Sequence, residues 1–167
     1  MPETIILGID PGTISTGYGI IKVSSNKIDP IDYGCIKPPP KAKLSERYRI
    51  LFESFNALLE KFNPDEVAVE LQYIGRNPRS AMTLSMARGV LILACSIKKI
   101  ACYEYTPSRV KKSLTGYGQA SKLQMQTMAA KMLHLAELPP EDAADALGIA
   151  LCHQHNKQLK KIEENIL

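Results

Sequence analysis

The sequence predicts an α/β fold in which one mixed five-stranded sheet is flanked by helices on both faces. Three strand-like apolar runs follow one another from the N-terminus. Helical segments then separate two further strand-like runs, and the chain ends in helical segments. This order of elements is typical of a sheet covered by helices. With 167 residues, 45% of them hydrophobic, the chain suits one domain with a substantial core.

The strands are predicted from short apolar runs bounded by Gly, Pro, Ser or Asn. The turn Pro11-Gly12-Thr13 separates the first two runs, and Ser24-Ser25-Asn26-Lys27 separates the second from the third. The first three strands are therefore expected to form a meander. Pro30 weakens the third strand, because proline cannot donate a hydrogen bond to its neighbour. The expected strands span residues 5–10, 17–23, 28–36, 66–71 and 101–105.

The helices are predicted from apolar residues that recur at spacings of three and four. Segment 44–62 has one wide apolar face. Segment 79–97 is apolar around most of its circumference, which is typical of a helix buried in the protein or partly covered by another subunit. Ser121 is a candidate N-cap, and Pro139-Pro140 marks another helix start. The expected helices span residues 44–62, 79–97, 108–114, 121–135 and 141–158.

Composition narrows the class of protein but not its activity. The formal net charge is +4, from 21 Lys and Arg against 17 Asp and Glu, which is a weak sign of an anionic partner. We find no apolar run long enough to span a bilayer and no signal peptide, so membrane insertion and secretion are not expected. The four cysteines are scattered and form no C-x-x-C pair, as in a reducing cytoplasm, where we expect the protein.

Four acidic residues occupy positions where a carboxylate calls for an explanation. Asp10 ends the first strand beside a Pro-Gly turn, and Glu70 ends the fourth. Asp142 and Asp145 are three residues apart near the start of the last helix, so they share one helix face. Taken alone, the helix pair could simply complement the helix dipole, and Glu70 could face solvent. Burying Asp10 on an apolar strand is costly unless it is paired or binds a metal.

Taken together, these acids predict a metal site. Strand ends and a helix start can bring four carboxylates to one point, where they cannot all ionise without cations. Oxygen ligands without a His or Cys cluster suit Mg²⁺, with Mn²⁺ as a possible substitute. Two such ions support phosphodiester hydrolysis, with Asp10 as the ligand between them. The histidines His134, His153 and His155 form no obvious site.

Several short motifs follow one another along the chain between about residues 4 and 155. They are Leu7-Gly8-Ile9-Asp10-Pro11-Gly12-Thr13, Thr16-Gly17-Tyr18-Gly19, Val69-Glu70-Leu71-Gln72-Tyr73, Ala87-Arg88-Gly89-Val90, Val110-Lys111-Lys112, Gly116-Tyr117-Gly118 and Asp142-Ala143-Ala144-Asp145-Ala146-Leu147. Each motif alone is weak, but their order resembles that of the RuvC family of Holliday-junction resolvases. The resemblance implies a ribonuclease H-like fold. It divides the chain into a single nuclease domain, residues 1–158, and a short tail, residues 159–167, to which we assign no role.

The resemblance also implies an activity and its partners. The family's members are homodimers that cut four-way DNA junctions symmetrically with Mg²⁺, in recombination and repair, alongside the junction-binding and branch-migration proteins RuvA and RuvB. The expected catalytic and metal-binding residues are Asp10, Glu70, Asp142 and Asp145. Segment 79–97 matches the family's dimer helix. Some members have His at the position of Asp142, which makes that ligand the least certain of the four.

A further group of residues is expected to contact DNA. Tyr73 stands where the family has an aromatic residue, usually Phe, near the junction bases. Lys111 and Lys122 match basic residues that approach the DNA. Lys112 follows Lys111 directly, and Arg76 lies close to Tyr73 in the sequence. Phosphate contacts by such residues position DNA and make binding depend on salt. A solvated basic surface would account equally well for the lysines.

Three other functions stay open on the sequence alone. An RNA-processing nuclease could share the same fold. An ATP-binding domain of the actin or sugar-kinase type also begins with a strand and an Asp-x-Gly-Thr turn. That class needs a second, similar domain, and this chain has no second Asp-x-Gly motif. A non-catalytic DNA-binding module is the third alternative, but four clustered acids would repel DNA without a metal.

Overall fold

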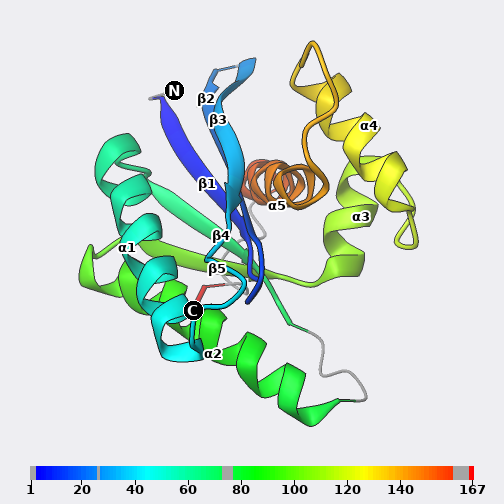
Figure 1. The fold of residues 1–167 in the computed structure, drawn as a ribbon. Helices are drawn as coiled ribbons and strands as arrows, with labels where there is room; N and C mark the ends of the chain where they lie inside the picture. Colours follow the sequence, from blue (N-terminus) through cyan, green and yellow to red (C-terminus); the bar gives the residue numbers. More distant parts are fainter. Residues whose placement is uncertain (1–2, 26, 73–76, 160–165) are drawn as a thin grey trace.

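The computed structural model describes residues 3–25, 27–72, 77–159 and 166–167 (Figure 1). The strands are β1 (Thr4–Asp10), β2 (Thr16–Ser24), β3 (Lys27–Ile36), β4 (Glu66–Glu70) and β5 (Ala101–Tyr105). The helices are α1 (Leu44–Phe62), α2 (Pro78–Ile97), α3 (Pro107–Thr115), α4 (Lys122–Met132) and α5 (Glu141–Gln158). The predicted bounds of α1, α5 and β5 are confirmed, and the others lie within one residue except at the end of α4.

The five strands form one mixed sheet in the order β3-β2-β1-β4-β5. β1 pairs antiparallel with β2, with Asp10 opposite Gly17, and parallel with β4, with Ile9 beside Val69. Parallel neighbours end at the same edge of a sheet. The register therefore places the ends of β1 and β4, and with them Asp10 and Glu70, next to each other.

Pro30 is accommodated at an irregularity in the sheet. The β2–β3 register shifts between Ile20, which pairs with Asp32, and Ile21, which pairs with Pro30. β3 is an edge strand, so the missing N–H of proline breaks the ladder on one side only. The strand predicted there is confirmed in spite of the proline.

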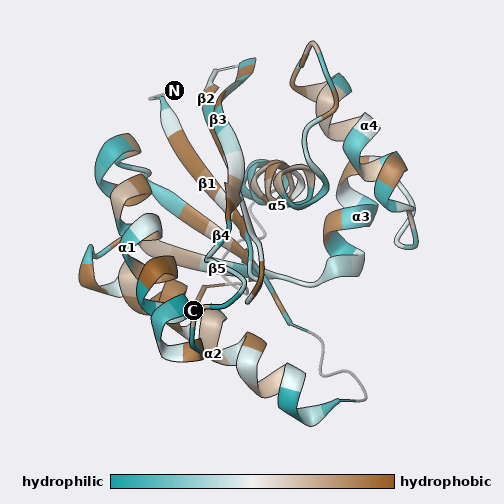
Figure 2. Cartoon of the chain, viewed as in Figure 1, coloured by the Kyte–Doolittle hydropathy of each residue, from teal (hydrophilic) through white to brown (hydrophobic). Residues whose placement is uncertain are grey.

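Helices cover both faces of the sheet, as predicted. α5 lies against one face with α3 and α4 beside it, and α1 and α2 lie on the other face (Figure 1). Successive residues of β1 belong to the two cores on opposite faces of the sheet. Ile6 belongs to the core under α5, and Leu7 belongs to the core under α1 and α2. Figure 2 shows the resulting apolar stretch along β1.

α5 packs directly on the backbone of β1 and β2. A Cβ added at Gly8 would lie 2.1 Å from the carbonyl oxygen of Ala146, and one at Gly19 would lie 2.7 Å from the amide nitrogen of Leu147. A Cβ at Gly17 would lie 1.9 Å from the carbonyl oxygen of Asp142. Glycine is needed at these positions for close approach, and that approach brings the first turn of α5 over the start of β2.

α4 ends three residues earlier than its predicted end at residue 135. Its first turn is confirmed, because Ser121 and Gln124 form a reciprocal capping box. The helix stops at Met132, and His134 adopts a positive φ of 52°. Apolar spacing continues through Leu133 and Leu135, so the periodicity extended the prediction beyond the point where the backbone turns.

α2 is less buried than its apolar sequence suggests. Its buried residues are Ala87, Leu91, Ala94 and Cys95. Its large exposed apolar residues are Met82, Met86, Leu93 and Ile97. By length and composition this helix could span a membrane, with a mean hydropathy of 1.6, so the statement that no apolar run is long enough was wrong. Core helices of soluble proteins reach the same length and hydropathy.

The tail is described at Leu159, Ile166 and Leu167. Ile166 forms an antiparallel β-bridge with Tyr103, and the Leu167 N–H donates a hydrogen bond of 2.9 Å to the carbonyl oxygen of Cys102. The end of the chain therefore covers part of the free edge of β5. The division into a domain of residues 1–158 and a tail of residues 159–167 stays a prediction.

Candidate active site

The four predicted acids lie within electrostatic reach of one another. Asp10 ends β1, Glu70 ends β4, and Asp142 and Asp145 lie in the first two turns of α5. Each of the four is partly buried. Burial, followed by the charges of Glu70, Asp145 and Asp142, raises the pKa of Asp10 from 3.8 to about 8. The structure thus brings together charges from three distant parts of the chain.

Two more carboxyls in this group hold protons more tightly than usual. Burial and the charge of Asp145 raise the pKa of Glu70 from 4.5 to about 7, while Lys111 acts in the opposite direction. Burial also raises the pKa of Asp145, with Lys122 opposing and Asp142 reinforcing the shift. A shared cause, partial burial with too little positive charge, explains the three shifts.

A narrow cleft opens beside two of these acids, Glu70 and Asp145, and two lysines. Its volume is about 160 Å³, and it is lined by Glu70, Pro107, Val110, Lys111, Lys122, Met125 and Asp145. Lys122 also forms an ion pair of 2.9 Å with Glu141, and both side chains are exposed. The predicted DNA-binding residues Lys111 and Lys122 are therefore placed beside the acids, where a phosphate group would need positive charge.

The turn after β1 holds one of the acids. Ser15 Oγ donates a hydrogen bond of 2.5 Å to Asp142 Oδ2. The turn itself is fixed by Thr16, whose hydroxyl donates to the carbonyl oxygen of Gly12 at 2.8 Å and accepts from its N–H at 3.1 Å. Sequence reasoning missed Ser15, because a serine in a polar turn gives no signal of a partner 127 residues away.

The chemistry of this donor set fits a hard divalent cation. Carboxylate oxygens are the ligands that Mg²⁺ and Mn²⁺ prefer, and a cation would offset the burial and the mutual repulsion that raise the pKa of Asp10. In the part of the chain that the structure describes, no three acidic, histidine or cysteine side chains lie close enough together to hold a metal ion.

The remaining predicted contacts are placed elsewhere. Lys112 does not line the cleft. It borders a separate pocket of about 310 Å³ on the side of α3 that faces the end of α5. Tyr73 and Arg76 lie outside the described residues. His153 lies at the far end of α5, where it contacts Glu66.

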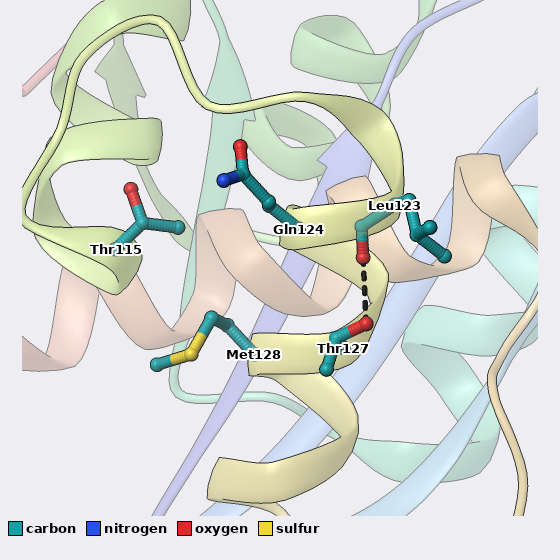
Figure 3. A pocket seen from close by; sticks show the side chains of 5 residues that line it. All are labelled: Thr115, Leu123, Gln124, Thr127 and Met128. Carbon is teal, nitrogen blue, oxygen red and sulfur yellow. Dashed lines mark hydrogen bonds between the residues drawn. The ribbon is translucent and has the colours of Figure 1, made fainter.

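The largest of the described pockets, about 390 Å³, lies away from the acids. It is lined by Thr115 from α3 and by α4 residues, and its lining is mostly apolar (Figure 3). One α4 hydroxyl, that of Thr127, is already bonded to the carbonyl oxygen of Leu123 at 2.8 Å. None of its lining residues, Thr115, Leu123, Gln124, Thr127 and Met128, is ionisable. The carboxylate cleft is therefore the better candidate for an active site.

The chain is similar to known proteins over most of its length. The family described as crossover junction endodeoxyribonuclease RuvC matches residues 6–153. A crossover junction endodeoxyribonuclease RuvC from Protochlamydia amoebophila is 47% identical over 160 residues, which is 95% of each chain. The protein of the same name from Clostridioides difficile is 42% identical over 163 residues, covering 97% of this chain and 96% of its own.

The solved structures extend the likeness to three dimensions. The structure titled T. thermophilus RuvC in complex with Holliday junction substrate matches with a TM-score of 0.91 and 31% identity. It covers 98% of this chain and 99% of its own. The fold is therefore ribonuclease H-like, as the motifs implied. The chain belongs to the RuvC family of crossover junction endodeoxyribonucleases.

Proposed function

We propose that the chain resolves four-way DNA junctions in recombination and repair by paired, symmetric, metal-dependent hydrolysis of phosphodiester bonds. The observation that carries this proposal is the group of acids at the ends of β1 and β4 and the start of α5, where burial and the mutual charge of the acids raise the pKa of Asp10 to about 8. Nucleases of this family depend on divalent metal ions. The likeness to a RuvC protein solved with a Holliday junction substrate supports DNA rather than RNA as the substrate.

Asp10, Glu70, Asp142 and Asp145 would hold the metal, and we propose two Mg²⁺ ions, replaceable by Mn²⁺. Bound metal would supply an activated water and a counter-charge for the leaving oxygen. Asp10 is the most central ligand, because the other three acids all act on its pKa. Ser15 orients Asp142 through their 2.5 Å hydrogen bond. Lys111 and Lys122 place positive charge at the cleft, where they would hold the phosphate backbone.

The DNA contacts beyond the cleft are proposals of the same kind. Tyr73 would stack on an unpaired base at the crossover, and Arg76 would contact the backbone beside it. Lys112 would hold a phosphate farther from the acids, since it borders a different pocket. Assistance by RuvA and RuvB, and a cytoplasmic location, are proposed on the family resemblance alone.

We propose that two copies associate through α2. Its apolar residues Met82, Met86, Leu93 and Ile97 are exposed by 54 to 67% in the single chain. An apolar face of this kind on a helix suits a two-fold interface with its own copy. Two active sites related by that axis would match the approximate symmetry of a four-way junction.

The test compares Asp145→Asn with Glu137→Gln, which neutralises an exposed acid outside the cleft. Each variant is given a synthetic four-way DNA junction, the same junction made of RNA, and Mg²⁺. We expect Asp145→Asn to bind the DNA junction without cutting it, and Glu137→Gln to cut at the normal rate. Full cleavage by Asp145→Asn would exclude the proposed carboxylate site.

A further inference from the structure

A buried polar network joins the far end of α5 to the sheet. His153 is completely buried, and such a side chain is costly to bury unless its polar atoms are bonded. Its Nε2 lies 3.0 Å from Glu66 Oε2, and its Nδ1 lies 2.7 Å from the Tyr105 hydroxyl. Lys157 Nζ donates to both oxygens of Glu66 at 2.8 Å. The network therefore spans β4, β5 and two turns of α5.

The hydrogen bonds give each group a defined role. The Glu66 carboxylate can only accept, so Nε2 carries the proton, and in neutral imidazole Nδ1 then accepts from the Tyr105 hydroxyl. Burial would raise the pKa of Glu66, but the hydrogen bonds from His153 and Lys157 outweigh it and lower the pKa. The Tyr103 ring lies 4.6 Å from the imidazole, centroid to centroid, and closes one side. Directional contacts on both ring nitrogens fix the position of His153.

This network and the active site lie at opposite ends of the same pair of elements. β4 begins at Glu66 and ends at Glu70, and four residues of strand span about 13 Å. On α5, Asp145 and His153 are eight residues apart, which is about 12 Å along the helix. The two lengths agree. A helix held at His153 by Glu66 therefore presents Asp145 at the level of Glu70.

Most of the contact between α5 and the sheet is apolar and close-packed. The sheet offers α5 the glycines Gly8 and Gly19, and α5 offers small residues such as Ala146 and Ala150. Apolar contact of this kind is not directional. At the active-site end, Asp145 and Glu70 line one cleft, so their spacing depends on how α5 lies along β4. The network holds α5 to β4 from the other end.

We propose that His153, with Glu66 and Tyr105, is a positioning residue that sets the distance between Asp145 and Glu70 and thereby the affinity of the site for divalent metal. The inference rests on the proposed function, because it concerns the metal site of that function. It predicts that loss of a contact far from the acids weakens metal binding. A merely structural residue would change stability and leave metal affinity unaltered.

The test measures Mn²⁺ binding to the free full-length protein by electron paramagnetic resonance, without DNA. His153→Phe keeps a ring and removes both hydrogen bonds. We expect its dissociation constant for Mn²⁺ to rise about tenfold, as for the loss of other groups that orient metal ligands. The matched control is Leu133→Ala, which opens the same core but removes no hydrogen bond of the network. It should lose thermal stability with less than about a twofold change in metal affinity.

Tyr105→Phe removes only a hydroxyl and tests the same idea if His153→Phe does not fold. We expect a rise of about threefold in the Mn²⁺ dissociation constant. The positioning role would be overturned if His153→Phe, or Tyr105→Phe in its place, bound Mn²⁺ with the same affinity as the control Leu133→Ala. If the unaltered protein binds no Mn²⁺, or Asp145→Asn binds it equally well, the proposed metal site itself fails, which is a different result from failure of the network alone.

Discussion

Replacing Asp10 with asparagine should stabilise the metal-free protein, and increasingly so as the pH rises. Asparagine has nearly the same shape as aspartate but carries no charge. In the native protein, burial and three neighbouring acids raise the pKa of Asp10 to about 8, from 3.8 in an unperturbed chain. The native state therefore binds a proton that the unfolded state releases. Stability from this group is fully present below pH 3.8 and is lost as the pH rises through about 8.

The size of the effect follows from the difference between the pKa of Asp10 in the native protein, about 8, and in the unfolded chain, 3.8. Each pH unit between the two pKa values costs about 1.4 kcal/mol of unfolding free energy. Between pH 5 and pH 8 the loss from Asp10 is therefore on the order of 4 kcal/mol, a large share of the stability of a typical domain. Asp10→Asn has no proton to lose at this position, so its advantage over the unaltered protein should grow by that amount.

The assay is urea unfolding followed by circular dichroism at pH 5 and pH 8, with chelator present. Glu137→Gln serves as the control, because Glu137 is an exposed acid that does not line the cleft. It should follow the unaltered protein at both pH values. If Asp10→Asn loses as much stability between pH 5 and pH 8 as the unaltered protein, Asp10 does not carry the charge conflict described above.

Three further predictions concern metal, packing and assembly. Since metal ligands must be ionised, Mg²⁺ should raise the melting temperature more at pH 8 than at pH 6, and an equal rise would argue against raised carboxyl pKa values. Gly8→Ala should destabilise the protein by about 3 kcal/mol or more, because its Cβ would meet the backbone of α5 at 2.1 Å, whereas Gly89→Ala, with nothing within 4 Å, should unfold no more easily than the unaltered protein. Met86→Glu should shift the mass seen by light scattering from two chains to one; a single-chain mass before the change would reject the dimer.

The sequence determined the elements well because their signals are local. Apolar spacing located α1 to the residue, Pro139-Pro140 located the start of α5, and the Pro-Gly turn and glycines located β1 and β2. The end of α4 was misplaced because an apolar pattern continues past the point where the backbone turns at His134. For α2, composition indicated burial without telling protein core from an interface.

The sequence indicated the acids of the candidate site, but not the residues that hold its elements in place. The acids could be named because each stands at the end of a strand or the start of a helix. Ser15, which holds Asp142, and Glu66, which holds His153, were not found, because their partners lie 127 and 87 residues away. Such contacts depend on how closely α5 packs on the sheet. Only the structure shows that a glycine permits that approach.

The most direct test of the central claim compares nicking of a four-way DNA junction with nicking of linear duplex of the same sequence. Each substrate is incubated with the unaltered protein in Mg²⁺ and, separately, in chelator. We predict paired nicks at the junction in Mg²⁺ only, and little cutting of the linear duplex. Equal cutting of both substrates, or cutting of the junction in chelator, would contradict a metal-dependent junction resolvase.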